Sequence, residues 1–182
     1  MILPNFFVVG APKAGTTSLY HHQDQHPDIF MSPMKETSYF SPEVRIEYLE
    51  SQLHARGRQG EEGLRAYLDS PPLGKRFGGI VTEWADYCRL FEGAGEQAAI
   101  GEASPCYLRS PTAAGRIAAL DAGAKVLMIL RNPVDRAFSQ YMQLANSNDY
   151  GCAFERHLEA CLARTRKDEI GLLSLSGVWF VC

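Results

Sequence analysis

The feature that most constrains the fold is a short apolar run that leads into a loop framed by two glycines. Phe6-Phe7-Val8-Val9 is rich in aromatic and β-branched residues, and Gly10-Ala11-Pro12-Lys13-Ala14-Gly15-Thr16-Thr17-Ser18 follows it directly. The apolar run predicts a buried strand. Residues 15–25 predict a helix, because Pro27 lies just beyond that segment. A strand, a glycine-rich turn and a helix in this order are the setting of a phosphate-binding loop.

The loop carries the groups that an anion site needs. A glycine-rich turn can point backbone N–H groups inward, and the helix start adds unsatisfied N–H groups. The residues expected to bind the anion are Lys13, Ala14, Gly15, Thr16, Thr17 and Ser18. In ATP- and GTP-binding loops the residue after the second glycine is Lys, whereas here it is Thr16. The displaced lysine favours a different anhydride from ATP; an ordinary strand–turn–helix junction with a surface lysine is the alternative.

Further strands and helices alternate along the chain. Strands are expected at 29–31, 98–100 and 125–130, and helices at 80–91, from Ser110-Pro111 to about 121, and from Pro133 onward, with two surface helices within 43–69. This alternation predicts an α/β fold with a central parallel sheet and right-handed crossovers. Segment 125–130 is continuously apolar, as central parallel strands are. The 182 residues are expected to form one domain, 1–182.

Composition excludes several functional classes. The net charge is −3, which gives no global attraction to nucleic acid. Five cysteines without CxxC spacing argue against a disulfide framework or a zinc site. His22 and His26 share a helix face, but no third metal ligand follows at motif distance. We find no secretory signal and no apolar run long enough to span a membrane, so a cytoplasmic protein is expected.

A second candidate anion site follows the strand at 125–130. Arg131 comes directly after that strand, Asn132 and Pro133 are suited to start a helix, and Ser139 lies two turns into it. Ligands of parallel sheets gather at the carboxyl ends of the strands, where both this arginine and the first loop are expected. The planar guanidinium of Arg131 suits a phosphate dianion. Alternatively, Arg131 caps a helix or pairs with Asp135, and Ser139 packs against its neighbours.

Pro12-Lys13-Ala14-Gly15-Thr16-Thr17 resembles the P-K-x-G-T-T loop of the sulfotransferases that use 3′-phosphoadenylyl sulfate (PAPS). The resemblance implies a P-loop NTPase-like three-layer fold. It also implies that Lys13 contacts the bridging oxygen and the sulfuryl group, while the loop backbone and threonines hold the 5′-phosphate. Arg131 and Ser139 would then bind the 3′-phosphate. A lysine can neutralise the leaving phosphate without a metal ion, so no metal is expected.

The segment Lys35-Glu36-Thr37-Ser38-Tyr39-Phe40 is similar to the E-x-x-F/Y-F segment of the branch that includes heparan sulfate sulfotransferases and many bacterial relatives. In that branch the glutamate is the base, a role the resemblance gives to Glu36. Sulfuryl transfer to an alcohol or amine needs such a proton acceptor. Lys35 would steady the sulfuryl oxygens or the acceptor. A solvated Lys–Glu pair on a loop is the alternative.

Gly101-Glu102-Ala103-Ser104-Pro105-Cys106-Tyr107-Leu108 resembles the family segment that lines the acceptor cleft. The resemblance gives substrate contacts to Glu102, Ser104 and Tyr107. Ala103 stands where some relatives have Lys, which leaves the acceptor class open. Glu102 is equally suited to a structural role, as a carboxylate that pairs with a basic neighbour.

The resemblance covers residues 6 to about 150, and the apolar end of the chain, 171–182, matches nothing in the family. The fold is therefore expected to be incomplete at its C-terminal end. The function implied is transfer of a sulfuryl group from PAPS to a hydroxyl or amine of a carbohydrate-like or small-molecule acceptor, leaving 3′,5′-adenosine bisphosphate. Two alternatives stay open: a truncated, inactive nucleotide-binding relative, and a P-loop kinase or NTPase.

Overall fold

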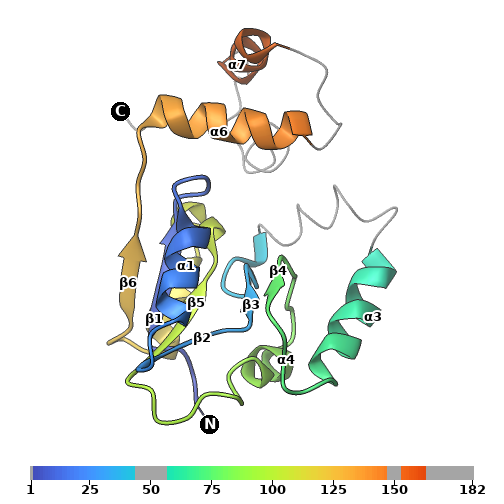
Figure 1. Ribbon diagram of the computed structural model, residues 1–182, viewed down its shortest axis with the longest axis vertical. Helices are drawn as coiled ribbons and strands as arrows, with labels where there is room; N and C mark the ends of the chain where they lie inside the picture. The colour runs from blue at the N-terminus through green and yellow to red at the C-terminus, as the bar shows by residue number, and fades with distance from the viewer. Residues whose placement is uncertain (1, 44–56, 147–152, 163–182) are drawn as a thin grey trace.

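The computed structural model describes residues 2–43, 57–146 and 153–162 (Figure 1). Its strands are β1 (Phe6–Gly10), β2 (Ile29–Met31), β3 (Met34–Lys35), β4 (Arg76–Phe77), β5 (Ala99–Ala103) and β6 (Lys125–Met128). Its helices are α1 (Thr16–Asp24), α3 (Gly57–Leu68), α4 (Trp84–Arg89), the short 3₁₀ helix η1 (Pro105–Arg109), α5 (Ala113–Leu120), α6 (Pro133–Asn146) and α7 (Phe154–Leu162).

Four strands form a parallel sheet in the order β2-β5-β1-β6, and β3 and β4 form a separate parallel pair. The predicted α/β fold with a central parallel sheet is therefore confirmed. The prediction that 125–130 is a central strand is wrong for the described sheet, because β1 is central and β6 lies at the edge. Val126 and Met128 are about half exposed there, so a continuous apolar run did not mean burial on both faces.

Alternation along β1 divides the interior into two layers. Phe7 and Val9 face a cluster that includes residues of α4, η1 and α5, whereas Phe6 and Val8 pack with Tyr20 of α1. These four residues of β1 are at most 6% exposed, as expected of a strand covered on both faces. Helices thus cover the two faces of the sheet, in three layers, with α1 on one side (Figure 1).

Several predicted boundaries move by a few residues. The strand expected at 98–100 extends to Ala103, so Glu102 lies on a strand and not in a loop. The helix expected at 80–91 shortens to α4, Trp84–Arg89. In the 43–69 region α3 begins at Gly57, and most of the helix expected before it lies outside the described residues. The helix expected from Ser110-Pro111 begins later, at Ala113 with Thr112 as its N-cap, and the Ser110 hydroxyl accepts the backbone N–H of Ala113 at 2.9 Å.

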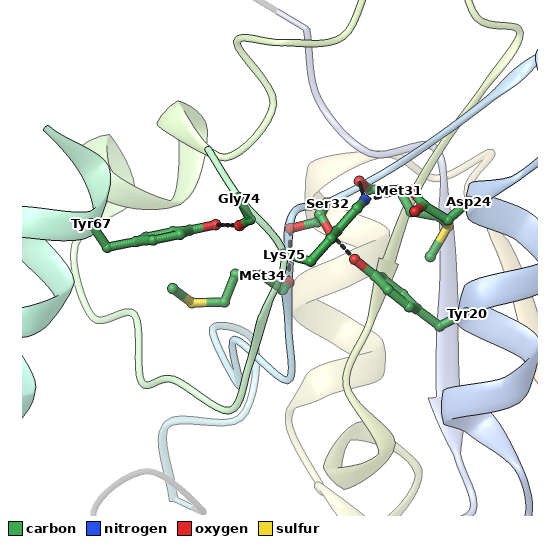
Figure 2. A network of polar contacts seen from close by, with 8 residues as sticks. All are labelled: Tyr20, Asp24, Met31, Ser32, Met34, Tyr67, Gly74 and Lys75. Atoms are coloured by element: carbon green, nitrogen blue, oxygen red, sulfur yellow. Dashed lines mark hydrogen bonds and ion pairs between the residues drawn. The ribbon is translucent and has the colours of Figure 1, made fainter. Parts of the chain in front are cut away.

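A polar network fixes α1 against the segment that leads to β3 (Figure 2). The Tyr20 hydroxyl donates to the carbonyl oxygen of Ser32 at 2.7 Å, and the Ser32 hydroxyl donates to that of Met34 at 2.9 Å. The Lys75 ammonium pairs with Asp24 near the end of α1 and lies 3.4 Å from the Met31 carbonyl oxygen. These contacts join the helix that follows the first loop to the strand that precedes Glu36.

Candidate functional site

The first loop leaves β1 and enters α1 through residues with positive φ. Gly10 has φ 146° and Gly15 has φ 102°, values that glycine adopts at little cost. The amide of Ala11 donates to the carbonyl oxygen of Ile129 at 2.7 Å, which fastens the loop to the chain just after β6. No side chain of the described residues caps the N-terminus of α1. The N–H groups at the start of α1 are therefore available to an anion, whereas the amide of Ala14, also expected to be free, donates to the carbonyl oxygen of Ala11 at 3.1 Å.

Lys13 lies within this loop, with its backbone in the left-handed region at φ 64°. Burial lowers the pKa of its ammonium group, the carboxylate of Glu36 opposes that change, and the charge of Arg131 adds to it. Both charges therefore act on Lys13, although Glu36 and Arg131 come from distant parts of the sequence. The structure brings these three predicted site residues into one electrostatic neighbourhood.

Arg131 and α6 stand beside the loop. An Nη1 group of Arg131 donates to the carbonyl oxygen of Lys13 at 3.3 Å, and the Arg131 side chain is otherwise exposed. The Asn132 side-chain oxygen accepts the backbone N–H of Val134 at 2.9 Å, which confirms Asn132 as the cap of α6. Ser139 is half-buried on that helix. Figure 1 shows α6 crossing the end of the molecule toward which the β1–α1 loop points.

The candidate base extends from the end of β3. Lys35 is the last residue of β3 and is 1% exposed, while the Glu36 side chain is 49% exposed. The Lys35 ammonium donates a short hydrogen bond to Oε1 of Glu36. Glu36 has φ 66°, so the chain turns sharply immediately after the strand. The pair is thus half-buried, unlike the fully solvated pair that the sequence left open, and the carboxylate remains accessible.

The three residues assigned to the acceptor cleft lie beneath this turn. Glu102 and Ser104 are 0% exposed and Tyr107 is 4% exposed. The hydroxyls of Ser104 and Thr37 both donate to Oε1 of Glu102, the latter at 3.1 Å. Burial raises the pKa of Glu102 to about 7, and hydrogen bonds from Ser104, Tyr107 and Thr37 and the charge of Lys35 oppose that rise. Their contacts are with the protein interior, and a substrate contact for them stays a prediction.

Thr37 was given no role from the sequence, yet it joins the two segments. Its hydroxyl contacts Glu102 and lies 3.3 Å from the hydroxyl of Tyr107, across 65 and 70 residues of sequence. Only the fold reveals this link, because it brings the residues that follow β3 close to β5 and η1. In the described part of the chain, no group of three or more His, Cys, Asp or Glu side chains could hold a metal ion. Likewise, none of the described helices has the length and apolar character of a membrane span.

Known proteins resemble this chain over most of its length. A family model described as the sulfotransferase family matches residues 4–174. The membrane-associated sulfotransferase kil1 of Dictyostelium discoideum is 30% identical over 142 residues, which are 78% of this chain and 23% of that protein. The human bifunctional heparan sulfate N-deacetylase/N-sulfotransferase 3 is 31% identical over 148 residues, 81% of this chain and 14% of that protein.

A solved structure agrees with these sequence matches. The sulfotransferase from Alicyclobacillus acidocaldarius is 34% identical and superposes with a TM-score of 0.71, covering 98% of this chain and 64% of that one. The chain thus spans under two thirds of that structure and less than a quarter of the two curated relatives. The family model alone covers far more than half of the chain. The phosphate-type loop, the Lys35–Glu36 turn and these matches agree, and the chain belongs to the sulfotransferase family.

Proposed function

We propose that this chain binds PAPS and transfers its sulfuryl group to a hydroxyl or amine of a carbohydrate-like or small-molecule acceptor. The observation that carries the proposal is the arrangement around Lys13. The charges of Glu36 and Arg131 both act on its ammonium group, and it lies beside the N-terminus of α1, which no described side chain caps. A donor with a 5′-phosphosulfate and a 3′-phosphate needs two cationic sites and a nearby base. The described residues supply groups of each kind.

In the proposed reaction the acceptor oxygen or nitrogen attacks the sulfur atom, and the bond from sulfur to the 5′-phosphate oxygen breaks. Glu36 takes the acceptor proton, since its side chain is half exposed and can be reached. Lys13 and the N–H groups at the start of α1 neutralise the charge that grows on the leaving phosphate. Arg131 and Ser139 hold the 3′-phosphate, and Lys35 orients Glu36 through its hydrogen bond.

Donor binding tests this proposal directly. Calorimetric titration with 3′,5′-adenosine bisphosphate should show binding in the absence of metal ions, and ATP with Mg²⁺ should bind more weakly. Binding of ATP–Mg²⁺ with no binding of the bisphosphate would favour a kinase or NTPase. Binding of the bisphosphate without any transfer would favour an inactive nucleotide-binding relative.

Arg131→Ala provides the residue-level test. If Arg131 binds the 3′-phosphate, the variant should lose about tenfold or more in affinity for the bisphosphate, because a charge-assisted contact disappears. Its affinity for adenosine 5′-phosphate, which lacks the 3′-phosphate, should change little. Arg116→Ala on α5 is the matched control and should leave both affinities unchanged. Equal weakening of both nucleotides by Arg131→Ala would remove the assignment.

A further inference from the structure

The turn that presents Glu36 is conformationally costly. Glu36 has φ 66° and Ser38 has φ 55°, and neither is a glycine. L-residues rarely adopt this left-handed region, because the Cβ atom crowds the backbone there. Such a conformation persists only where surrounding contacts hold it. The contacts that hold this turn therefore decide where the Glu36 carboxylate points.

Several of those contacts come from the end of β5 and the start of η1, and the amide of Val81 adds another by donating to the carbonyl oxygen of Thr37 at 3.1 Å. The amide of Glu36 donates to the carbonyl oxygen of Ala103 at 2.8 Å, and the amide of Ser38 donates to the hydroxyl of Ser104 at 3.2 Å. The amide of Phe40 donates to the hydroxyl of Tyr107 at 3.3 Å. Three amides of the turn, at alternate positions, are thus fastened to the same buried segment.

Glu102 accepts hydrogen bonds from two hydroxyl groups at the turn. Its Oε1 accepts hydrogen bonds from both Ser104 and Thr37, so the Ser104 oxygen is left to accept the amide of Ser38. Glu102 is 0% exposed, and its Oε2 has no hydrogen-bond partner among the residues that the structure describes. Burying a carboxylate costs free energy, so an uncharged side chain of the same size would fill this space at a lower cost in stability. The charge of Lys35 favours the ionised form of Glu102, and the same ammonium donates to Glu36.

We propose that Glu102 is a positioning residue for sulfuryl transfer: with Thr37 and Ser104 it holds the Glu36–Ser38 turn so that the Glu36 carboxylate faces the acceptor. This inference rests on the proposed function for its effect on catalysis. The hold on the turn itself can be measured without catalysis. Glu102 does not touch the reactants in this role, because it is wholly buried beneath the turn.

Hydrogen–deuterium exchange of the full chain tests the hold on the turn. Glu102→Gln keeps the volume but removes the charge, and the amides of Glu36, Ser38 and Phe40 should then exchange about tenfold faster or more. The amides of β1 and the 10–18 loop should be unaffected. Thr37→Val should speed exchange at the same three amides. Thr37→Ser should leave them as protected as in the wild type, because serine keeps the hydroxyl group. Glu43→Gln is the matched control, since Glu43 also accepts hydrogen bonds from a serine and a threonine, Ser110 and Thr112.

Kinetics with PAPS and N-desulfated heparin as the probe acceptor tests the catalytic consequence. Glu102→Gln should lower kcat about 10- to 100-fold with little change in the KM for PAPS, since a small misplacement of a base has such effects. The wild-type rate should rise with pH around 7, and Glu102→Gln should lose that rise. Unchanged exchange of the turn in both Glu102→Gln and Thr37→Val would overturn the inference, as would a uniform rise in exchange across the sheet. Failure to bind 3′,5′-adenosine bisphosphate would instead reject the proposed function and leave the exchange result standing.

Discussion

At the residue scale, both side chains assigned to the chemistry stand on strained backbone. Lys13 has φ 64° and Glu36 has φ 66°, so each lies in the left-handed region that ordinary residues avoid. Glycine would adopt these angles at lower cost, but it would carry neither charge. Strain kept at a functional position is expected where the side chain is needed more than the stability it costs. This reasoning leads to a direct comparison at Lys13.

Replacing Lys13 by Ala or by Gly removes the same ammonium group, but only the glycine relieves the backbone. We expect Lys13→Gly to be about 1 kcal/mol more stable to unfolding than Lys13→Ala. Both variants should lose affinity for 3′,5′-adenosine bisphosphate to a similar extent, because both lack the cation. Urea denaturation and calorimetric titration measure the two effects separately. An alanine variant as stable as the glycine variant would show that the angle at Lys13 carries no cost.

At the element scale, short stretches of sequence predicted the features that depend only on residues adjoining along the chain. The apolar run at β1, the Asn132 cap of α6 and the loop between β1 and α1 were all visible in short stretches of sequence. The position of β6 at the sheet edge was not, because edge and central strands can share an apolar pattern. The contact of Thr37 with Glu102 was also hidden, since it joins residues 65 positions apart whose spacing carries no motif.

Close packing between strands leads to a prediction at Gly101. This residue lies in β5 opposite Phe6 of β1 and Met31 of β2. A Cβ atom at Gly101 would lie 2.2 Å from the Phe6 ring and 2.6 Å from the Met31 sulfur, so both side chains would have to move. We expect Gly101→Ala to lower the free energy of unfolding by about 1–3 kcal/mol.

Gly115 in α5 is the matched control for that substitution. A Cβ atom there meets nothing within 4 Å, so Gly115→Ala should be neutral or stabilising by up to about 1 kcal/mol. Thermal and urea unfolding of the two variants measure the difference. Equal effects of the two substitutions would show that the sheet accommodates the extra methyl group and that packing around β5 is looser than these distances indicate.

At the scale of the whole molecule, the buried carboxylate of Glu102 couples the site to overall stability. Its pKa is about 7 in the folded chain, above the ordinary value of 4.5, chiefly because burial disfavours the charged form. Between these values the folded chain holds a proton that the unfolded chain has released. Stability from this group is therefore fully present below about pH 4.5 and is lost as the pH rises through about 7. As the pH rises through about 7, Glu102 gains the negative charge that is proposed to hold the turn, and the folded chain becomes less stable.

Urea unfolding of wild type and Glu102→Gln across pH 4.5–8 measures this coupling, because their difference cancels the other titrating groups. At about 1.4 kcal/mol per pH unit, the wild type should lose roughly 3 kcal/mol relative to the variant over this range, as an upper value. The pKa of Glu43 is lowered, so the difference in stability between wild type and Glu43→Gln should stay constant around neutral pH. A difference between wild type and Glu102→Gln that stays constant with pH would mean that Glu102 does not change its charge there. The rise of kcat around pH 7 would then need another titrating group, and the turn would be held by Glu102 in a single protonation state.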